Sequence, residues 1–114
     1  FDAVCQIWHT CGMDIEWHGA SKADLMGFPD DAKREAEYQL RRVQSGLEPS
    51  NWKPMKSVGT GVKEIGIFEE SGMFRVLYVA NLKGKLHVLH AFQKKTEKTE
   101  KHDIQLAKAR LKAI

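Results

Sequence analysis

The sequence predicts an α+β domain in which helices pack on one face of a mostly antiparallel sheet. Three strand patterns follow one another within residues 62–93 with short turn sequences between them, which is typical of antiparallel strands. A long amphipathic helix pattern precedes these strands and a shorter one follows them. Strands grouped in this way, with helices before and after, favour the α+β class. We expect the opposite face of the sheet to be partly open and to carry the function.

The length and composition fit one domain. A chain of 114 residues can form one core but not two. The regular pattern begins at Met13, so residues 1–12 are interpreted as an N-terminal extension and residues 13–114 as the domain. Cys5 and Cys11 have neither CxxC nor metal-knuckle spacing, and we interpret them as thiols of a reducing cytoplasm. No apolar run approaches the roughly 20 residues of a membrane span.

The N-terminal half is expected to contain one strand and two helices. Residues 13–17 alternate apolar and acidic side chains, which indicates a short strand. Ser21 is placed to cap a short helix, and Pro29 suits the first turn of a longer one. The expected inward stripe of the longer helix is Ala32, Ala36, Leu40, Val43 and Leu47. Residues 48–61 are rich in proline and glycine and are expected to form a loop.

The C-terminal half is expected to contain the three strands and a last helix. The strands are predicted at 62–68, 73–81 and 86–93, and the helix over 102–114. The second and third strands are apolar on both faces, so we expect them at the centre of the sheet. The predicted helix stripe is Ile104, Ala107 and Leu111.

Positive charge is concentrated at the C-terminal end. Residues 83–114 hold nine lysines and arginines and three acidic residues, a net charge of +6. The whole chain has a net charge of +3, so the remaining residues are slightly acidic. This distribution favours binding to a polyanion or an acidic protein, although a solvated charged helix would explain it equally well.

Arg75 stands out because it lies in the otherwise apolar strand MFRVLYV. A buried guanidinium must either pair with an acid or point into a polar cleft, since burial without a partner is very costly. Glu64 on the neighbouring strand is the expected partner in the first case. In the second case Arg75 would clamp a phosphate with its planar guanidinium. Tyr78 lies on the opposite face of the strand and is expected in the core.

The histidines and the remaining lysines give weaker signals. His87 and His90 are three residues apart in one strand and are expected to face opposite sides of the sheet. No three ligands show zinc-site spacing and no nucleotide-binding glycine pattern occurs, so neither metal nor cofactor is expected. Phe92 could stack on a base, although a core role is the alternative. The lysines expected to contact phosphates are Lys53, Lys56, Lys63, Lys95 and Lys98.

The order of four segments resembles a known family. DLMGFPDDAKREAEYQLRRVQSG, WKPMKSVGTGVKEI, SGMFRVLYVA and VLHAFQKKTEKTEKHDIQLAKAR follow one another as in the phage-derived Gp49-like, or HigB-like, branch of the RelE/ParE toxin superfamily. The resemblance covers about residues 13–114. It implies a RelE-like fold and a toxin of a type II toxin–antitoxin system that cleaves messenger RNA on the ribosome without a metal ion.

The resemblance also implies site residues. Arg75 matches the arginine that stabilises phosphate, and Lys94 matches the basic end of the following strand. Where the archetypal RelE toxins carry two catalytic lysines, this chain has Glu64 and Gly66. The general base must then be His90, His102, a lysine or Glu64 itself. The implied partner is a helix-turn-helix, HigA-like antitoxin. A ParE-like toxin that inhibits DNA gyrase is the main alternative, and a nucleic-acid-binding phage accessory protein is the weaker one.

Overall fold

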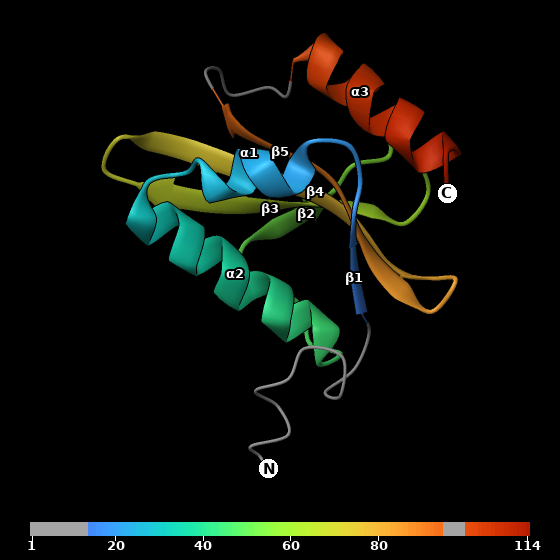
Figure 1. Ribbon diagram of the computed structural model, residues 1–114, viewed down its shortest axis with the longest axis horizontal. Coiled ribbons are helices and arrows are strands. Elements are labelled where there is room, and N and C mark those ends of the chain that lie inside the picture. Colours follow the sequence, from blue (N-terminus) through green and yellow to red (C-terminus); the bar gives the residue numbers. More distant parts are fainter. Residues whose placement is uncertain (1–13, 95–99) are drawn as a thin grey trace.

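The computed structural model describes residues 14–94 and 100–114, which form a five-stranded sheet with three helices (Figure 1). Within this sheet β1 is parallel to β5 and the other neighbours are antiparallel, in the order β1-β5-β4-β3-β2. The elements along the chain are β1 (Asp14–Trp17), α1 (Ser21–Met26), α2 (Asp30–Gln44), β2 (Trp52–Pro54), β3 (Val62–Glu69), β4 (Gly72–Leu82), β5 (Lys85–Lys94) and α3 (Lys101–Lys112). The predicted α+β class and the central position of the last two strands are confirmed.

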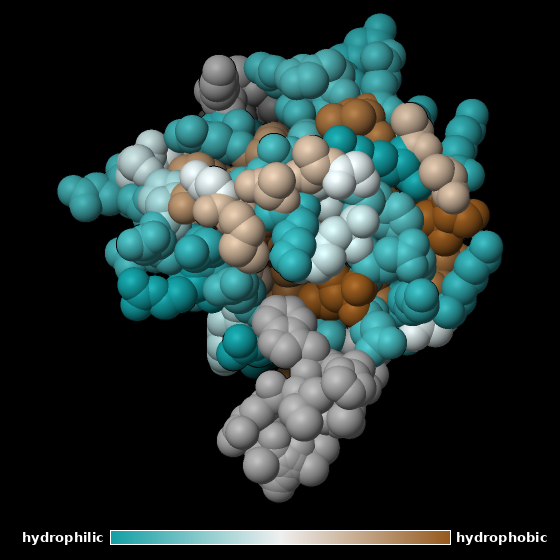
Figure 2. Space-filling view, viewed as in Figure 1, coloured by the Kyte–Doolittle hydropathy of each residue, from teal (hydrophilic) through white to brown (hydrophobic). Residues whose placement is uncertain are grey.

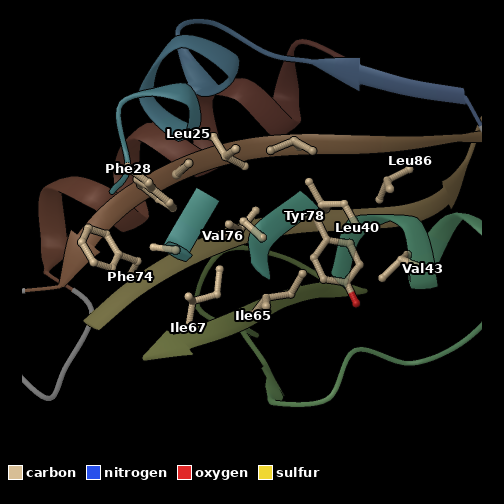
Figure 3. Packing of buried hydrophobic residues seen from close by; sticks show 14 residues of the cluster. Leu25, Phe28, Leu40, Val43, Ile65, Ile67, Phe74, Val76, Tyr78 and Leu86 are labelled. Atoms are coloured by element: carbon tan, nitrogen blue, oxygen red, sulfur yellow. The ribbon is translucent and has the colours of Figure 1, made fainter. Parts of the chain in front are cut away.

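The helices divide the sheet into two faces. We call the first the α2 face, because α1 and α2 pack there on side chains such as Ile65, Val76 and Tyr78 (Figure 3). The second is the α3 face, where Ala107 of α3 packs with Leu77. Alternate residues of β4 belong to the two clusters, so these are opposite faces. One helix therefore covers part of the face that the sequence left open, while Tyr78 is buried as expected.

Helix α2 forms where its periodicity indicates, but it ends before Leu47. Its inward residues are all buried, and Asp30 in its first turn faces the positive end of the helix dipole. Gly46 has a φ of 88°, and the Leu47 amide donates to the Arg42 carbonyl at 2.9 Å. The chain thus leaves the helix through a left-handed glycine. Leu47 is 54% exposed, so its place in the predicted stripe was wrong.

Two local predictions in the first half were also wrong. Ser21 is the first residue of α1 rather than its cap, and its buried hydroxyl donates to the Val88 carbonyl at 3.2 Å. The predicted loop 48–61 contains the edge strand β2, which pairs with β3. Pro54 is tolerated there because an edge strand need not donate a hydrogen bond on its outer side.

A β-bulge in β5 changes the direction of one histidine. Leu77 of β4 lies opposite His90, whereas Tyr78 lies opposite Val88, so β5 has one extra residue at this point. The extra residue brings His87 and His90 to the same α3 face. The prediction that they face opposite sides was wrong because simple alternation fails across a bulge.

Hydrophilic residues form most of the surface in the view of Figure 2, and hydrophobic areas are small and separate. Within the described parts of the chain, no helix is both long enough and apolar enough to span a membrane.

Candidate functional site: a cation-rich cleft on the sheet

A buried carboxylate with three cations around it lies on the α3 face. The side chain of Glu64 is only 1% exposed, and its Oε1 lies 3.2 Å from Nε of Arg75. The Nζ atoms of Lys53 and Lys94 lie 3.6 Å and 3.7 Å from the same oxygen. Glu64 and its three cations are called the Glu64 cluster below. It brings together four of the residues selected from the sequence.

Strand register positions the Glu64 cluster. Glu64 lies opposite Lys53 of β2 on one side and opposite Leu77 of β4 on the other. Arg75 lies opposite Gly66, two residues further along β3. Directly opposed residues share a face, so strand alternation places the side chains of Lys53, Glu64 and Arg75 on the α3 face.

Gly66 leaves the space that the Arg75 guanidinium occupies. A Cβ atom at position 66 would lie 3.1 Å from Nη1 of Arg75 and 2.9 Å from Nδ2 of Asn51. Either distance is too short for an ordinary contact. Glu64 and Gly66, which replace the two lysines of the archetypal toxins, therefore have a structural explanation. Gly66 leaves room for the Arg75 guanidinium above β3, and the Glu64 carboxylate pairs with it.

Lys94 is the most unusual cation of the cluster. Its side chain is 2% exposed, and among the described residues its ammonium has no hydrogen-bond partner. Burial lowers the pKa of Lys94 because the charged form loses water. The Glu64 carboxylate opposes this effect and raises the pKa, while Arg75 and Lys53 lower it further. A lysine in such surroundings is better suited to exchange a proton near neutral pH than an exposed one.

The cluster opens to solvent through a shallow cleft of about 110 Å³. Two aromatic residues that the sequence analysis did not select, Trp52 and Phe68, line it. Phe68 is 65% exposed, and the Arg75 guanidinium carbon lies 5.5 Å from its ring centre. The available sequence signal was a phenylalanine at the end of the predicted strand 62–68. Asn51 is a third residue that was missed, and it lines the cleft beside Gly66.

His90 lies on the same row of the sheet as Glu64. Leu77 of β4 is opposite Glu64 on one side and opposite His90 on the other, so the two are two strands apart. Nε2 of His90 lies 2.7 Å from Oδ1 of Asp103, in the first turn of α3. Its Nδ1 is buried without a hydrogen-bond partner among the described residues, and its ring stacks on Phe92 at 4.8 Å. Asp103 thus fixes the histidine by Nε2, while Nδ1 can still accept a hydrogen bond.

The remaining predicted residues lie elsewhere. Lys63 is opposite Tyr78 and thus on the α2 face, where it pairs with Glu48 at 3.2 Å. Lys56 lines a separate hollow together with residues 59–63. Lys95 and Lys98 lie outside the described residues. His102 is 73% exposed on α3, with Nε2 3.3 Å from Asp103.

Ligand side chains converge in two places, although no three ligands show zinc-site spacing in the sequence. In the described part of the chain, Glu16, His18 and His87 bring their ligand atoms within 4.8 Å of one another, and so do Glu100, His102 and Asp103. The first group joins β1 and β5, whose strand residues are about 70 positions apart in the chain. Local spacing therefore gives no sign of it.

A mostly antiparallel five-stranded sheet with helices packed on it is compatible with the RelE-like fold of small toxins. The family model of phage-derived Gp49-like proteins (DUF891) matches residues 23–112, and the chain belongs to this family. It is a RelE/ParE-like family of toxins from toxin–antitoxin systems, and its members are often ribonucleases. An antitoxin is therefore the implied partner. No curated protein matches the chain.

Proposed function

We propose that this protein is a HigB-like, ribosome-dependent endoribonuclease that inhibits translation by cleaving messenger RNA. The observation that carries the proposal is the Glu64 cluster, where Arg75, Lys53 and Lys94 surround one carboxylate. Glu64, Arg75 and Lys53 line an open cleft, and Lys94 lies buried beside them. Three cations against one anion favour an incoming phosphate. The exposed ring of Phe68 beside Arg75 offers a stacking surface for a base.

The proposed reaction needs no external nucleophile. The 2′-oxygen forms a bond to the adjacent phosphorus, and the bond from phosphorus to the 5′-oxygen breaks. Arg75 and Lys53 neutralise the phosphate, a task for which a metal ion is the usual alternative. His90, oriented by Asp103, accepts the proton of the 2′-hydroxyl through Nδ1. Lys94 donates a proton to the leaving 5′-oxygen, for which its lowered pKa suits it.

Glu64 has a positioning role in this scheme. Its carboxylate holds the Arg75 guanidinium at 3.2 Å and the Lys94 ammonium at 3.7 Å. Without this anion, the two cations beside it would repel each other and move apart. Glu64→Gln should therefore lower cleavage by displacing the phosphate-binding groups.

Gyrase inhibition is the second candidate function. It is favoured by the pairing of the cleft residues with one another, since Arg75 already has a carboxylate partner. To decide between the two, the protein would be induced while translation, transcript ends and DNA supercoiling are followed separately. The ribonuclease proposal predicts new transcript ends within the time in which translation stops, with supercoiling unchanged. A change in supercoiling without new transcript ends would support the gyrase alternative.

Arginine variants connect this experiment to the cleft. Arg75→Ala should abolish new transcript ends and toxicity. Arg34→Ala is the matched control, because Arg34 is 74% exposed on α2 and pairs only at the surface with Asp31. Equal toxicity of the two variants at equal protein levels would exclude Arg75 from the site.

We also propose that the antitoxin is a small helix-turn-helix, HigA-like protein. The net charge of +6 over residues 83–114 would accelerate association with an acidic partner surface. Co-purification from the native operon, followed by a growth-rescue assay, tests this. A neighbouring gene product that neither binds nor relieves toxicity would contradict it.

A further inference from the structure

The sheet edge formed by β1 and β5 carries a group of side chains that the proposed ribonuclease does not use. Glu16 of β1 lies directly opposite His87 of β5 in the parallel register, and His18 follows two residues later. The three side chains meet on one side of this strand pair, and their ligand atoms all lie within 4.8 Å of one another. They are called the β1–β5 histidine site. We propose that this site binds a divalent transition-metal ion, zinc in particular.

The two imidazoles are arranged as a pair of ligands. Nε2 of His18 lies 2.8 Å from Nδ1 of His87, so at most one proton can lie between them. Two nitrogen ligands of a tetrahedral zinc ion, each at the usual distance of about 2.0–2.1 Å from the metal, lie slightly further apart than these two nitrogens do. A small separation of the rings would therefore admit the ion, which would replace the shared proton.

The tautomer of His87 is already the one that a metal needs. Its Nε2 lies 2.8 Å from the carbonyl oxygen of Leu82, which can only accept a hydrogen bond. The proton is thus on Nε2, and the lone pair of Nδ1 points at His18. Histidine ligands of metal ions usually donate their second N–H to a carbonyl or carboxylate in this way. His87 is 2% exposed, so this arrangement is shielded from water.

Glu16 supplies the third ligand and is itself held in place. Its Oε2 faces Nε2 of His18 at 3.6 Å, while its Oε1 lies 3.2 Å from the Lys85 ammonium. Lys85 therefore pairs with Oε1, which leaves Oε2 of Glu16 to bind the metal ion. The Glu16 side chain is 44% exposed, which leaves a route from solvent to the site.

Two cations face the site and set a limit on its affinity. Lys85 pairs with Glu16, and Arg110 of α3 approaches Gly19 while donating to the Leu89 carbonyl at 2.8 Å. Their charges disfavour a divalent ion, so we expect weaker binding than in a closed four-ligand structural site. Two histidines and one carboxylate leave a fourth position for water or a small ligand. The ion would join the four-residue edge strand β1 to the sheet.

The other group of ligands is less suited to a metal. Glu100, His102 and Asp103 offer one imidazole and two carboxylates, and Asp103 is already bound to His90 at 2.7 Å. His102→Gln is therefore a matched control. Cys5, His9 and Cys11 belong to the segment outside the described residues and offer further ligands, so a Cys5→Ser, Cys11→Ser variant is the second control.

The experiment titrates the full-length protein with Zn²⁺ alone in a calorimeter and with Co²⁺ in a visible spectrometer. We expect one equivalent of zinc and a cobalt spectrum of four- or five-coordination. Glu16→Gln and His18→Gln should each weaken binding by about tenfold or more, the size of effect known from changes around metal ligands. His102→Gln and the double cysteine variant should bind as the parent does.

The readouts distinguish metal binding from loss of the fold and from ribonuclease activity. Glu16 is a half-exposed surface residue, so Glu16→Gln should keep the fold, as judged by its NMR spectrum without metal. Zinc should shift the ring signals of His18 and His87, and none of these readouts depends on cleavage activity. Unshifted ring signals at about tenfold molar excess of zinc would overturn the proposal. So would binding that is lost in the double cysteine variant but retained in His18→Gln.

Discussion

The guanidinium of Arg75 lies 3.2 Å from the carboxylate of Glu64, whose side chain is 1% exposed, while that of Arg75 is 12% exposed. The ion pair and the phosphate clamp were alternatives for Arg75 when only the sequence was considered. In the structure the pair exists and also lines an open cleft, so the two are compatible. A phosphate entering the cleft would share the guanidinium with Glu64.

The first prediction concerns stability. Arg75→Ala should lower the free energy of unfolding by about 2–3 kcal/mol, because it removes a cation 3.2 Å from a buried carboxylate. The cost stays below that of a fully isolated charge because Lys94 and Lys53 remain near Glu64. Glu64→Gln combined with Arg75→Ala should be less destabilising than the sum of the two single changes. Urea denaturation measures all three variants, and additive effects would show that the pair contributes nothing.

The second prediction concerns the proton on Lys94. Its pKa is lowered by burial and raised by the Glu64 carboxylate, so Glu64→Gln should lower it further. Burial disfavours the charged form of Lys94 in the folded state and so lowers the free energy of unfolding at low pH. This loss of stability disappears as pH rises through the folded and then the unfolded pKa of Lys94. NMR of lysines labelled at the side-chain carbon, with Lys94→Arg for assignment, follows the titration. A Lys94 signal that titrates at the ordinary pKa of a lysine side chain would contradict the prediction.

The third prediction concerns Gly66. Gly66→Ala should displace the ends of the Arg75 and Asn51 side chains, whose atoms lie 3.1 Å and 2.9 Å from the new Cβ. We expect RNA cleavage to fall at least tenfold, with a loss of stability of about 1 kcal/mol or less. Gly46→Ala is the contrasting control, because no atom lies within 4 Å but φ is 88°. It should cost about 1–2 kcal/mol through backbone strain and leave cleavage unchanged.

The fourth prediction concerns the contact between β5 and α3. Asp103→Asn should cost about 1–3 kcal/mol, because the buried His90 ring loses its charged partner at 2.7 Å. Amide exchange should accelerate first in α3, whose packing depends on this contact. Cleavage should fall more than the folded fraction does if Asp103 also orients His90. A proportional fall of both would show that the contact is only structural.

The fifth prediction separates the metal from the reaction. Cleavage should persist in excess chelator, because Arg75, Lys53 and Lys94 supply the positive charge at the phosphate. The melting temperature should fall in chelator only if the β1–β5 histidine site holds an ion. Chelator that abolishes cleavage on ribosomes shown to be intact, with recovery on adding divalent ions, would overturn the proposed mechanism.

The sequence by itself determined the fold class and all the elements except the edge strand β2. The spacing of Ala32, Ala36, Leu40 and Val43 gave α2 its buried stripe, and two doubly apolar segments became the central strands. It also offered Glu64 as the partner of Arg75 in one of two alternatives, because a buried guanidinium needs either an acid or a polar cleft. These properties depend on local periodicity and on the cost of burying a charge, both of which can be read from neighbouring residues.

Only the tertiary structure decided which side chains meet. The bulge in β5 placed His87 and His90 on one face. The meeting of His18 with His87 depends on the parallel pairing of β1 with β5. Such contacts arise from register and from packing between distant segments, where a shift of one residue turns a side chain to the opposite face. No local pattern in the sequence records that register.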